Sequence, residues 1–169
     1  MSDLYRPFLA GLETSNFVIG VQLGDLKNED AQRRARGDAG ASISWIIGHL
    51  LSYRCMVLQA CGVDQPNPYE ETFSYEAPAT GGENYPDIAE LRAAWSEIHD
   101  KVREMLSGLS DEQILAQSEL PSPTGGGTLL DGLSFLVWHE SYHIGTIGML
   151  RVQFGYQHTH ERAMAAMES

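Results

Sequence analysis

Seven apolar residues recur every three or four positions between residues 88 and 106, and the positions between them carry many charges. The seven are Ile88, Leu91, Trp95, Ile98, Val102, Met105 and Leu106. Because an α-helix turns once in about 3.6 residues, this spacing places all of them on one face. Asp87 stands at the start of the segment and Gly108 at its end. The pattern predicts an amphipathic helix that buries one side.

Two earlier segments also have helical character. Residues 5–26 carry an imperfect apolar stripe, with Pro7 in the first turn, where a helix tolerates it. The next helix is apolar around much of its circumference and ends at Gly62. Ser42 or Ser44 can cap its start.

A fourth long helix is expected after Thr128, which forms a capping pattern with Asp131, and it ends at Gly155. Ser110 and Gln113 repeat that pattern for one short helical turn. No segment alternates between apolar and polar residues as a strand does. These patterns predict an all-α fold, a four-helix bundle, formed by a single domain over residues 1–169.

Two stretches separate the predicted helices, and the second is expected to be a long loop. Residues 27–40 are polar, and residues 62–86 contain four prolines and three glycines. A loop as long as the second one is often functional. Its aromatic residues either form part of a pocket wall or pin the loop to the bundle, and they are Tyr69, Phe73, Tyr75 and Tyr85.

Charge and cysteine content limit the function classes. The formal net charge of −12 argues against binding to nucleic acid, which requires cations to replace the counterions of phosphate, and against an anionic membrane surface. No apolar run is long enough to span a bilayer, and the N-terminus lacks the pattern of a signal peptide. Cys55 and Cys61 are too far apart on one helix for a disulfide, so both are expected to be reduced core residues. We expect a cytoplasmic protein.

His139 and His143 stand four residues apart, so a helix places both on one face about 6 Å apart along its axis. Their neighbours are mostly apolar, which suggests that this face points into the protein. Two buried imidazoles side by side need partners, and one shared metal ion would satisfy both. The alternative is a pair of core histidines bonded to backbone or hydroxyl groups.

His49 lies in the middle of the second, apolar helix. Alone it would be read as an ordinary core histidine, but bundles assemble metal sites from inward-facing residues on neighbouring helices. Three neutral imidazoles from His49, His139 and His143 suit a divalent metal ion such as Zn, Ni, Fe or Cu. They would leave a coordination position open, as catalytic sites do.

These residues resemble a known family, the DinB/YfiT-like metalloenzymes, over nearly the whole chain. The resemblance rests on His49 within SWIIGHLLSY and on His139 and His143 within VWHESYHIGTIGMLR, together with helix order and length. It implies a four-helix bundle with one His on the second helix and the pair on the last, and a metal-dependent enzyme of the thiol S-transferase, isomerase or hydrolase type. A low-molecular-weight thiol would then be a co-substrate and a small molecule the substrate. The family often has Gln where this chain has Thr146, which puts a polar contact near the site in doubt.

The letters HESYH also match the HExxH signature of zinc proteases, in which the Glu is a general base. The longer metzincin motif is absent, since Thr146 and Met149 occupy its Gly and His positions. We expect Glu140 to lie next to the metal ligands or in solvent rather than to act in catalysis. A non-catalytic protein that binds a metal or another ligand is a further alternative.

Two further expectations concern the surface. His99 is assigned to the charged side of its helix, and His158 and His160 to a polar tail, so all three are expected to be solvated. A homodimer is expected because proteins that this chain resembles often pair through their helices, and because the first and last long helices carry apolar residues on more than one face. These residues are Phe17, Val18, Ile19, Met149, Leu150 and Val152. The alternative is a monomer in which the loop of residues 62–86 covers this surface.

Overall fold

The computed structural model describes residues 3–37, 39–74, 77, 79 and 85–168, and its regular elements there are all helices. The long helices are α1 (Arg6–Leu23), α3 (Ile43–Ala60), α5 (Ile88–Gly108) and α7 (Leu129–Gln153). The short helices are α2 (Asn28–Gln32), α4 (Glu70–Phe73), α6 (Asp111–Leu115) and α8 (Thr159–Met167). The predicted all-α fold is confirmed. None of the helices in these ranges combines the length and apolar character needed to cross a membrane.

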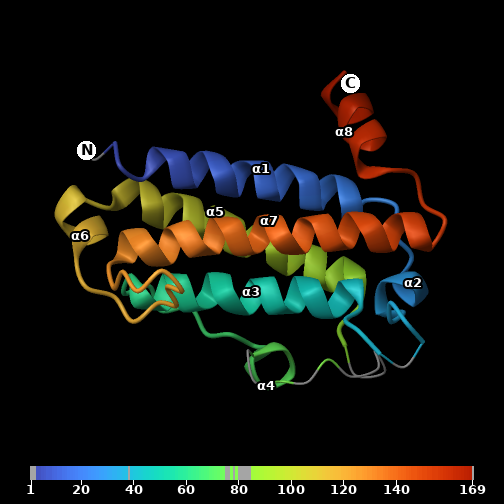
Figure 1. The fold of residues 1–169 in the computed structure, drawn as a ribbon, viewed down its shortest axis with the longest axis horizontal. Coiled ribbons are helices and arrows are strands. Elements are labelled where there is room, and N and C mark those ends of the chain that lie inside the picture. Colours follow the sequence, from blue (N-terminus) through green and yellow to red (C-terminus); the bar gives the residue numbers. More distant parts are fainter. Residues whose placement is uncertain (1–2, 38, 75–76, 78, 80–84, 169) are drawn as a thin grey trace.

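The four long helices lie side by side, with α7 between α1 and α3 in the view of Figure 1 and α5 behind them. Helix α3 packs against α5 and α7, and α1 packs against the same two helices on the other side. Each long helix contributes fully buried apolar side chains to one core, for example Leu12, Ile47, Val102 and Leu136. Burial of this apolar surface is the main favourable contribution to folding.

The helix starts follow the capping signals of the sequence. The Ser42 hydroxyl accepts a hydrogen bond from the backbone N–H of Trp45, which settles the start of α3. Thr128 and Asp131 form a complete capping box at the start of α7, and Ser110 with Gln113 does the same for α6.

Helix α5 is capped by a residue from another element. The side-chain oxygen of Asn28 accepts a hydrogen bond from the backbone N–H of Ile88, and its amide nitrogen donates to the Asp87 carboxylate. Asp87 is the first residue before the helix, as predicted, but its own side chain does not cap it. The short helix α2 therefore provides the cap.

Three short helices lie outside the four predicted long ones. Helix α2 lies within the polar stretch 27–40, α4 within the predicted loop 62–86 and α8 in the predicted tail after Gly155, so the loop and tail predictions are wrong in part. Helices this short are marginal in isolation. Contacts with other elements stabilise them, as when Arg162 of α8 donates to the carbonyl of Val21.

Candidate metal centre

The three predicted ligands come from two neighbouring helices. His49 lies in the middle of α3, and His139 and His143 lie one turn apart in the middle of α7, which runs beside α3 (Figure 1). His49 and His139 are buried, and His143 is partly buried. The structure thus brings together two segments that are about ninety residues apart in the chain.

The ring nitrogens converge on one point. The Nε2 atom of His139 lies 3.3 Å from Nε2 of His49 and 3.1 Å from Nε2 of His143. One nitrogen from each ring lies within 4.8 Å of the other two, which makes the three residues a group that could hold a metal ion. Nitrogens bound to one tetrahedral zinc ion at 2.0–2.1 Å would be about 3.3 Å apart. The observed separations therefore fit a shared ion.

Burial keeps the three imidazoles neutral. It lowers the pKa of His49 to about 4, with a further lowering from His139 and an opposing effect from the backbone of Phe73. The pKa of His143 falls to about 3, mainly because of burial, with a further electrostatic lowering from His139 and His49. Burial also lowers the pKa of His139. Each ring can therefore offer a lone pair at neutral pH, as a metal requires.

Hydrogen bonding alone does not satisfy this cluster. Nε2 of His139 faces two other Nε2 atoms, and a single ring nitrogen either donates one proton or offers one lone pair. Among the described residues, the Nδ1 atoms of all three rings have no hydrogen bond of good geometry, although the Phe73 backbone lies close enough to His49 to affect its pKa. One cation facing all three lone pairs would remove the conflict.

Aromatic rings hold the imidazoles in place. The Trp45 ring stacks on His49 at a centroid distance of 4.7 Å and an interplanar angle of 13°. The Tyr53 ring is in an edge-to-face arrangement with His49, with ring centroids 4.9 Å apart, and its centroid lies 4.3 Å from that of the His139 ring. Sequence reasoning did not single out these two residues. Their positions four residues before and after His49 were the available signal, since that spacing places all three on one helix face.

Glu140 was expected to lie either next to the metal ligands or in solvent, and it does not lie in solvent. Its carboxylate is fully buried and accepts two hydrogen bonds from Arg54, at 2.7 and 3.0 Å. A general base must reach the proton that it removes. Because Arg54 occupies both oxygens, this placement does not fit the Glu of a zinc protease, and the described residues include none of the strands that flank such a motif.

The prediction for His99 is wrong, because this residue is buried at 2% exposure. Its Nδ1 faces Arg54 at 3.1 Å, and its Nε2 faces the Glu13 carboxylate at 3.1 Å. Since arginine can only donate, Nδ1 accepts, and the ring carries its proton on Nε2. Burial and the charge of Arg54 lower the pKa of His99, although Glu13 opposes them. Arg54 also stacks over Trp95, 3.7 Å from the ring centroid, so this buried polar network joins all four long helices.

The remaining candidates behave as expected or play no part in the cluster. Cys55 and Cys61 are free, and Cys55 is buried as expected, whereas Cys61 is only partly buried at the end of α3. Burial raises the pKa of the Cys55 thiol to about 11. His158 and His160 are exposed, as predicted, although they stand at the start of α8 rather than in an irregular tail. The Thr146 hydroxyl donates to the Tyr142 carbonyl of its own helix.

The aromatic residues of the predicted loop have two different roles. Phe73 is fully buried and packs directly over Gly48, so it pins the loop to α3. Tyr69 instead lines a hollow of about 230 Å³ and donates a hydrogen bond to Glu90. Tyr85 packs against Phe73, with ring centroids 5.0 Å apart. Tyr75 lies outside the described residues.

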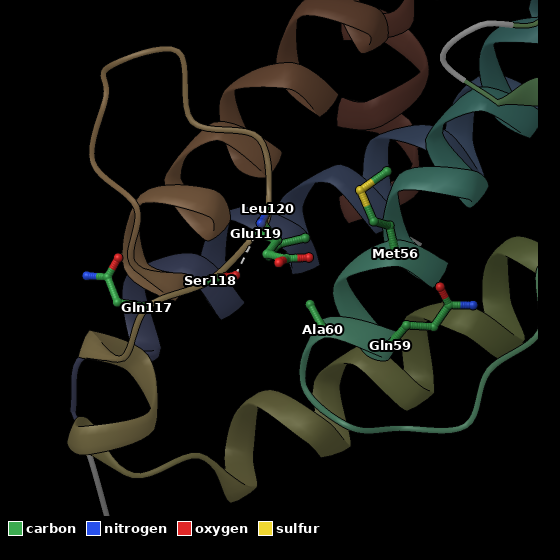
Figure 2. Close-up of a pocket in the computed structure, with 7 residues that line it drawn as sticks. All are labelled: Met56, Gln59, Ala60, Gln117, Ser118, Glu119 and Leu120. Carbon is green, nitrogen blue, oxygen red and sulfur yellow. Dashed lines mark hydrogen bonds between the residues drawn. The ribbon is translucent and has the colours of Figure 1, made fainter.

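A cavity of about 740 Å³ lies between α3 and the segment that precedes α7 (Figure 2). Its lining consists of Met56, Gln59, Ala60, Gln117, Ser118, Glu119 and Leu120. The three histidines are not among these residues. Met56 and Gln59 also border a smaller hollow that reaches Tyr53, which contacts His139. The large cavity is therefore separate from the histidine cluster, whereas the smaller hollow borders Tyr53 beside the cluster.

A family model matches most of this chain. The family model of the DinB superfamily matches residues 22–147, which include His49, His139 and His143. A comparison with curated proteins finds no match. The matched span is well over half of the chain.

Proposed function

This chain belongs to the DinB superfamily, and on that premise we propose that it is a metal-dependent enzyme acting on a small molecule. One divalent ion, Zn, Ni or Fe, would be held by His49, His139 and His143. The reaction would be a thiol transfer or isomerisation that uses a low-molecular-weight thiol, or a hydrolysis.

The observation that carries the proposal is the convergence of three neutral imidazoles. The Nε2 atom of His139 lies 3.1 Å from Nε2 of His143 and 3.3 Å from Nε2 of His49, as expected for ligands of one ion. Within the described residues, this group contains three side chains and no fourth His, Cys or acidic ligand. Three protein ligands are typical of catalytic zinc sites, which keep one position for water or substrate, whereas structural sites have four.

The protein's own residues would supply a dry and rigid setting. When bound, a divalent ion supplies Lewis acidity, which lowers the pKa of a coordinated water or thiol towards neutrality. Trp45 stacks on His49, and Tyr53 packs against both His49 and His139, so these two rings would restrict the orientation of the imidazoles. Rigid positioning of this kind matters because catalytic geometry tolerates little displacement.

Metal analysis of purified variants tests the ligand set. We expect about one ion per chain in the wild type by elemental analysis, and a large loss in each of the variants His49→Ala, His139→Ala and His143→Ala. The control replaces the exposed pair His158 and His160 by Ala, which removes adventitious binding without touching the cluster. Full metal occupancy in all three single variants would show that the assignment is wrong.

Activity is tested by a screen of model electrophiles with common low-molecular-weight thiols, alongside ester and amide substrates without thiol. Turnover should require metal and should be lost in His139→Ala. Dependence on thiol would favour transfer or isomerisation, and activity without thiol would favour hydrolysis.

The second candidate is a non-catalytic protein that binds metal or ligand, and the buried, aromatic-walled position of the cluster is the observation that favours it. Substitution with Co²⁺ distinguishes the two, because its visible absorption reports the ligands. A spectrum that changes when a thiol is added indicates an open position and supports the enzyme. An unchanged four-coordinate spectrum supports a structural metal.

The cysteines support a proposal about the location of the protein. Two free thiols, one of them buried, suit a reducing compartment. We therefore place the proposed activity in the cytoplasm, which cell fractionation would test.

A further inference from the structure

Three aromatic side chains on α7 form a row that extends from the histidine pair to the protein surface. Phe135, Trp138 and Tyr142 alternate with the two histidines at spacings of three and four residues, so all five share one side of the helix. The rings of Phe135 and Trp138 lie 5.8 Å apart at 27°, and those of Trp138 and Tyr142 lie 6.0 Å apart at 20°. These near-parallel arrangements fall within the range of aromatic stacking.

This row is directly joined to the candidate metal centre. The Phe135 ring lies 5.4 Å from the His139 ring at 22°, and the Tyr142 ring meets His143 nearly at a right angle at 5.1 Å. Trp138 and Tyr142 are nevertheless 60% and 61% exposed. Large aromatic side chains that are stacked beside a buried site and exposed to solvent are typical of a surface that binds a ligand.

A cavity lies at the Phe135 end of the row. It has a volume of about 320 Å³, within the range of sites that hold small molecules. Its lining consists of Ser122, Pro123 and Thr124 from the segment before α7 and of Asp131, Ser134, Phe135 and Trp138 from α7. Phe135 therefore borders both this cavity and His139.

The segment that forms the outer wall is fixed at both ends. The backbone N–H of Ser118 donates to the carbonyl of Gly127 at 2.7 Å, and that of Leu129 donates to the carbonyl of Ala116 at 2.9 Å. Leu120 is buried against Gly132 of α7. These contacts hold the wall in place, which reduces the ordering cost of binding.

The polar groups of the cavity indicate which ligands suit it. Its lining, among the residues that the structure describes, contains no lysine or arginine. The one carboxylate, Asp131, already accepts hydrogen bonds from Thr128 and from the backbone N–H of Gly127. The exposed positions of α7, a helix described throughout, carry no charge either. In a chain of net charge −12, such a site disfavours anions and offers stacking rather than ion pairing.

We propose that Phe135, Trp138 and Tyr142, with the adjoining cavity, bind a planar, uncharged aromatic part of the substrate beside the metal centre. The inference rests on the proposed function in one respect, which is that the metal centre acts on the molecule held here. The flat rings would stack on the substrate, and its reactive group would extend past Phe135 towards the histidines.

The probe for the test is 2-naphthol, a neutral planar molecule. Its matched controls are decahydro-2-naphthol, which has the same skeleton without flat rings, and 2-naphthoate, which adds a negative charge. Dissociation constants are measured by calorimetry on protein treated with a chelator, so that the result does not depend on a bound metal. We expect 2-naphthol to bind at least tenfold more tightly than either control.

Two variants locate the binding. Trp138→Leu should weaken 2-naphthol binding roughly tenfold, as expected for the loss of one stacking ring. Met149→Leu, an exposed position further along α7, should change binding by less than twofold. Circular dichroism checks that both variants are folded, as expected for side chains outside the core.

A second measurement is independent of the variants. In protein loaded with Co²⁺ or Mn²⁺, the naphthol proton signals should broaden strongly if the ring lies beside the histidines. The proposal is overturned by equal binding to Trp138→Leu, by equally tight binding of the saturated or charged analogue, by tighter binding of tetramethylammonium, or by absence of broadening in the metal-loaded protein. If the chain binds no metal but naphthol binds at Trp138, the proposed function fails and the aromatic site remains.

Discussion

Replacing either partner of the buried Arg54–Glu140 pair should destabilise the protein far more than replacing both. Both side chains are fully buried, and two hydrogen bonds of 2.7 and 3.0 Å join them. Glu140→Leu leaves a guanidinium without its carboxylate, and Arg54→Met leaves a carboxylate without its guanidinium. Breaking a buried pair from one side costs about 3–5 kcal/mol.

The surroundings refine these magnitudes. After Glu140→Leu, Arg54 keeps its contacts with His99 and with the face of Trp95, so we expect the lower end of that range. The double variant removes both charges, which is often neutral or stabilising by about 1–4 kcal/mol, but it leaves Nδ1 of His99 unpaired at a cost of about 1–3 kcal/mol. The double variant should therefore lie within about 3 kcal/mol of the wild type, well below the sum of the single costs.

The assay is urea unfolding followed by circular dichroism at pH 7 with a chelator present, because a bound metal would add its own stabilisation. Glu97→Gln is the control. It breaks the exposed pair between Glu97 and Lys101 and should cost less than about 1 kcal/mol. Single costs that simply add up in the double variant, or a single cost below about 1 kcal/mol, would refute the reasoning.

Three further predictions concern other parts of the molecule. Gly48→Ala should destabilise the protein by about 1–3 kcal/mol in thermal unfolding, because an added Cβ would overlap the ring of Phe73; an unchanged melting temperature would contradict this packing. Burial lowers the pKa of His99, so the folded chain takes up a proton only at a lower pH than the unfolded chain does, and stability should fall as the pH drops below about 6.5. Urea midpoints of His99→Gln should depend less on pH between 7.5 and 5 than those of the wild type, and an identical dependence would exclude this role. Light scattering should give the mass of a homodimer, because the apolar side chains of Met149 and Phe17 are 74% and 40% exposed. The variant Met149→Glu should be monomeric. A wild-type mass of one chain across the accessible concentrations would exclude the dimer.

Two of the six residues behind the dimer prediction turn out to belong to the core. Ile19 is fully buried and Leu150 is 5% exposed, whereas Met149 and Val152 remain at the surface. The sequence shows that a helix is apolar on several sides. It does not show which of those sides a neighbouring helix covers.

The sequence determined the features that depend on local spacing. Apolar residues at three- and four-residue intervals gave the long helices, because one turn of helix has 3.6 residues. Side chains that cap a helix bond to backbone groups two or three residues away, so the capping boxes at Ser110 and Thr128 could be read directly. The pairing of His139 with His143 follows from the same local geometry.

The tertiary structure decided the features that depend on partners far along the chain. A polar residue in an apolar helix is either a ligand, a member of an ion pair or a surface group, and its own helix does not distinguish these outcomes. His49 meets the histidine pair of α7, while His99 and Glu140 meet Arg54 in the core. The lone arginine in the apolar helix α3 was a signal for such a pair. The identity of its partner required the packing of α3 against α5 and α7, because burial of a charge depends on which groups surround it in space.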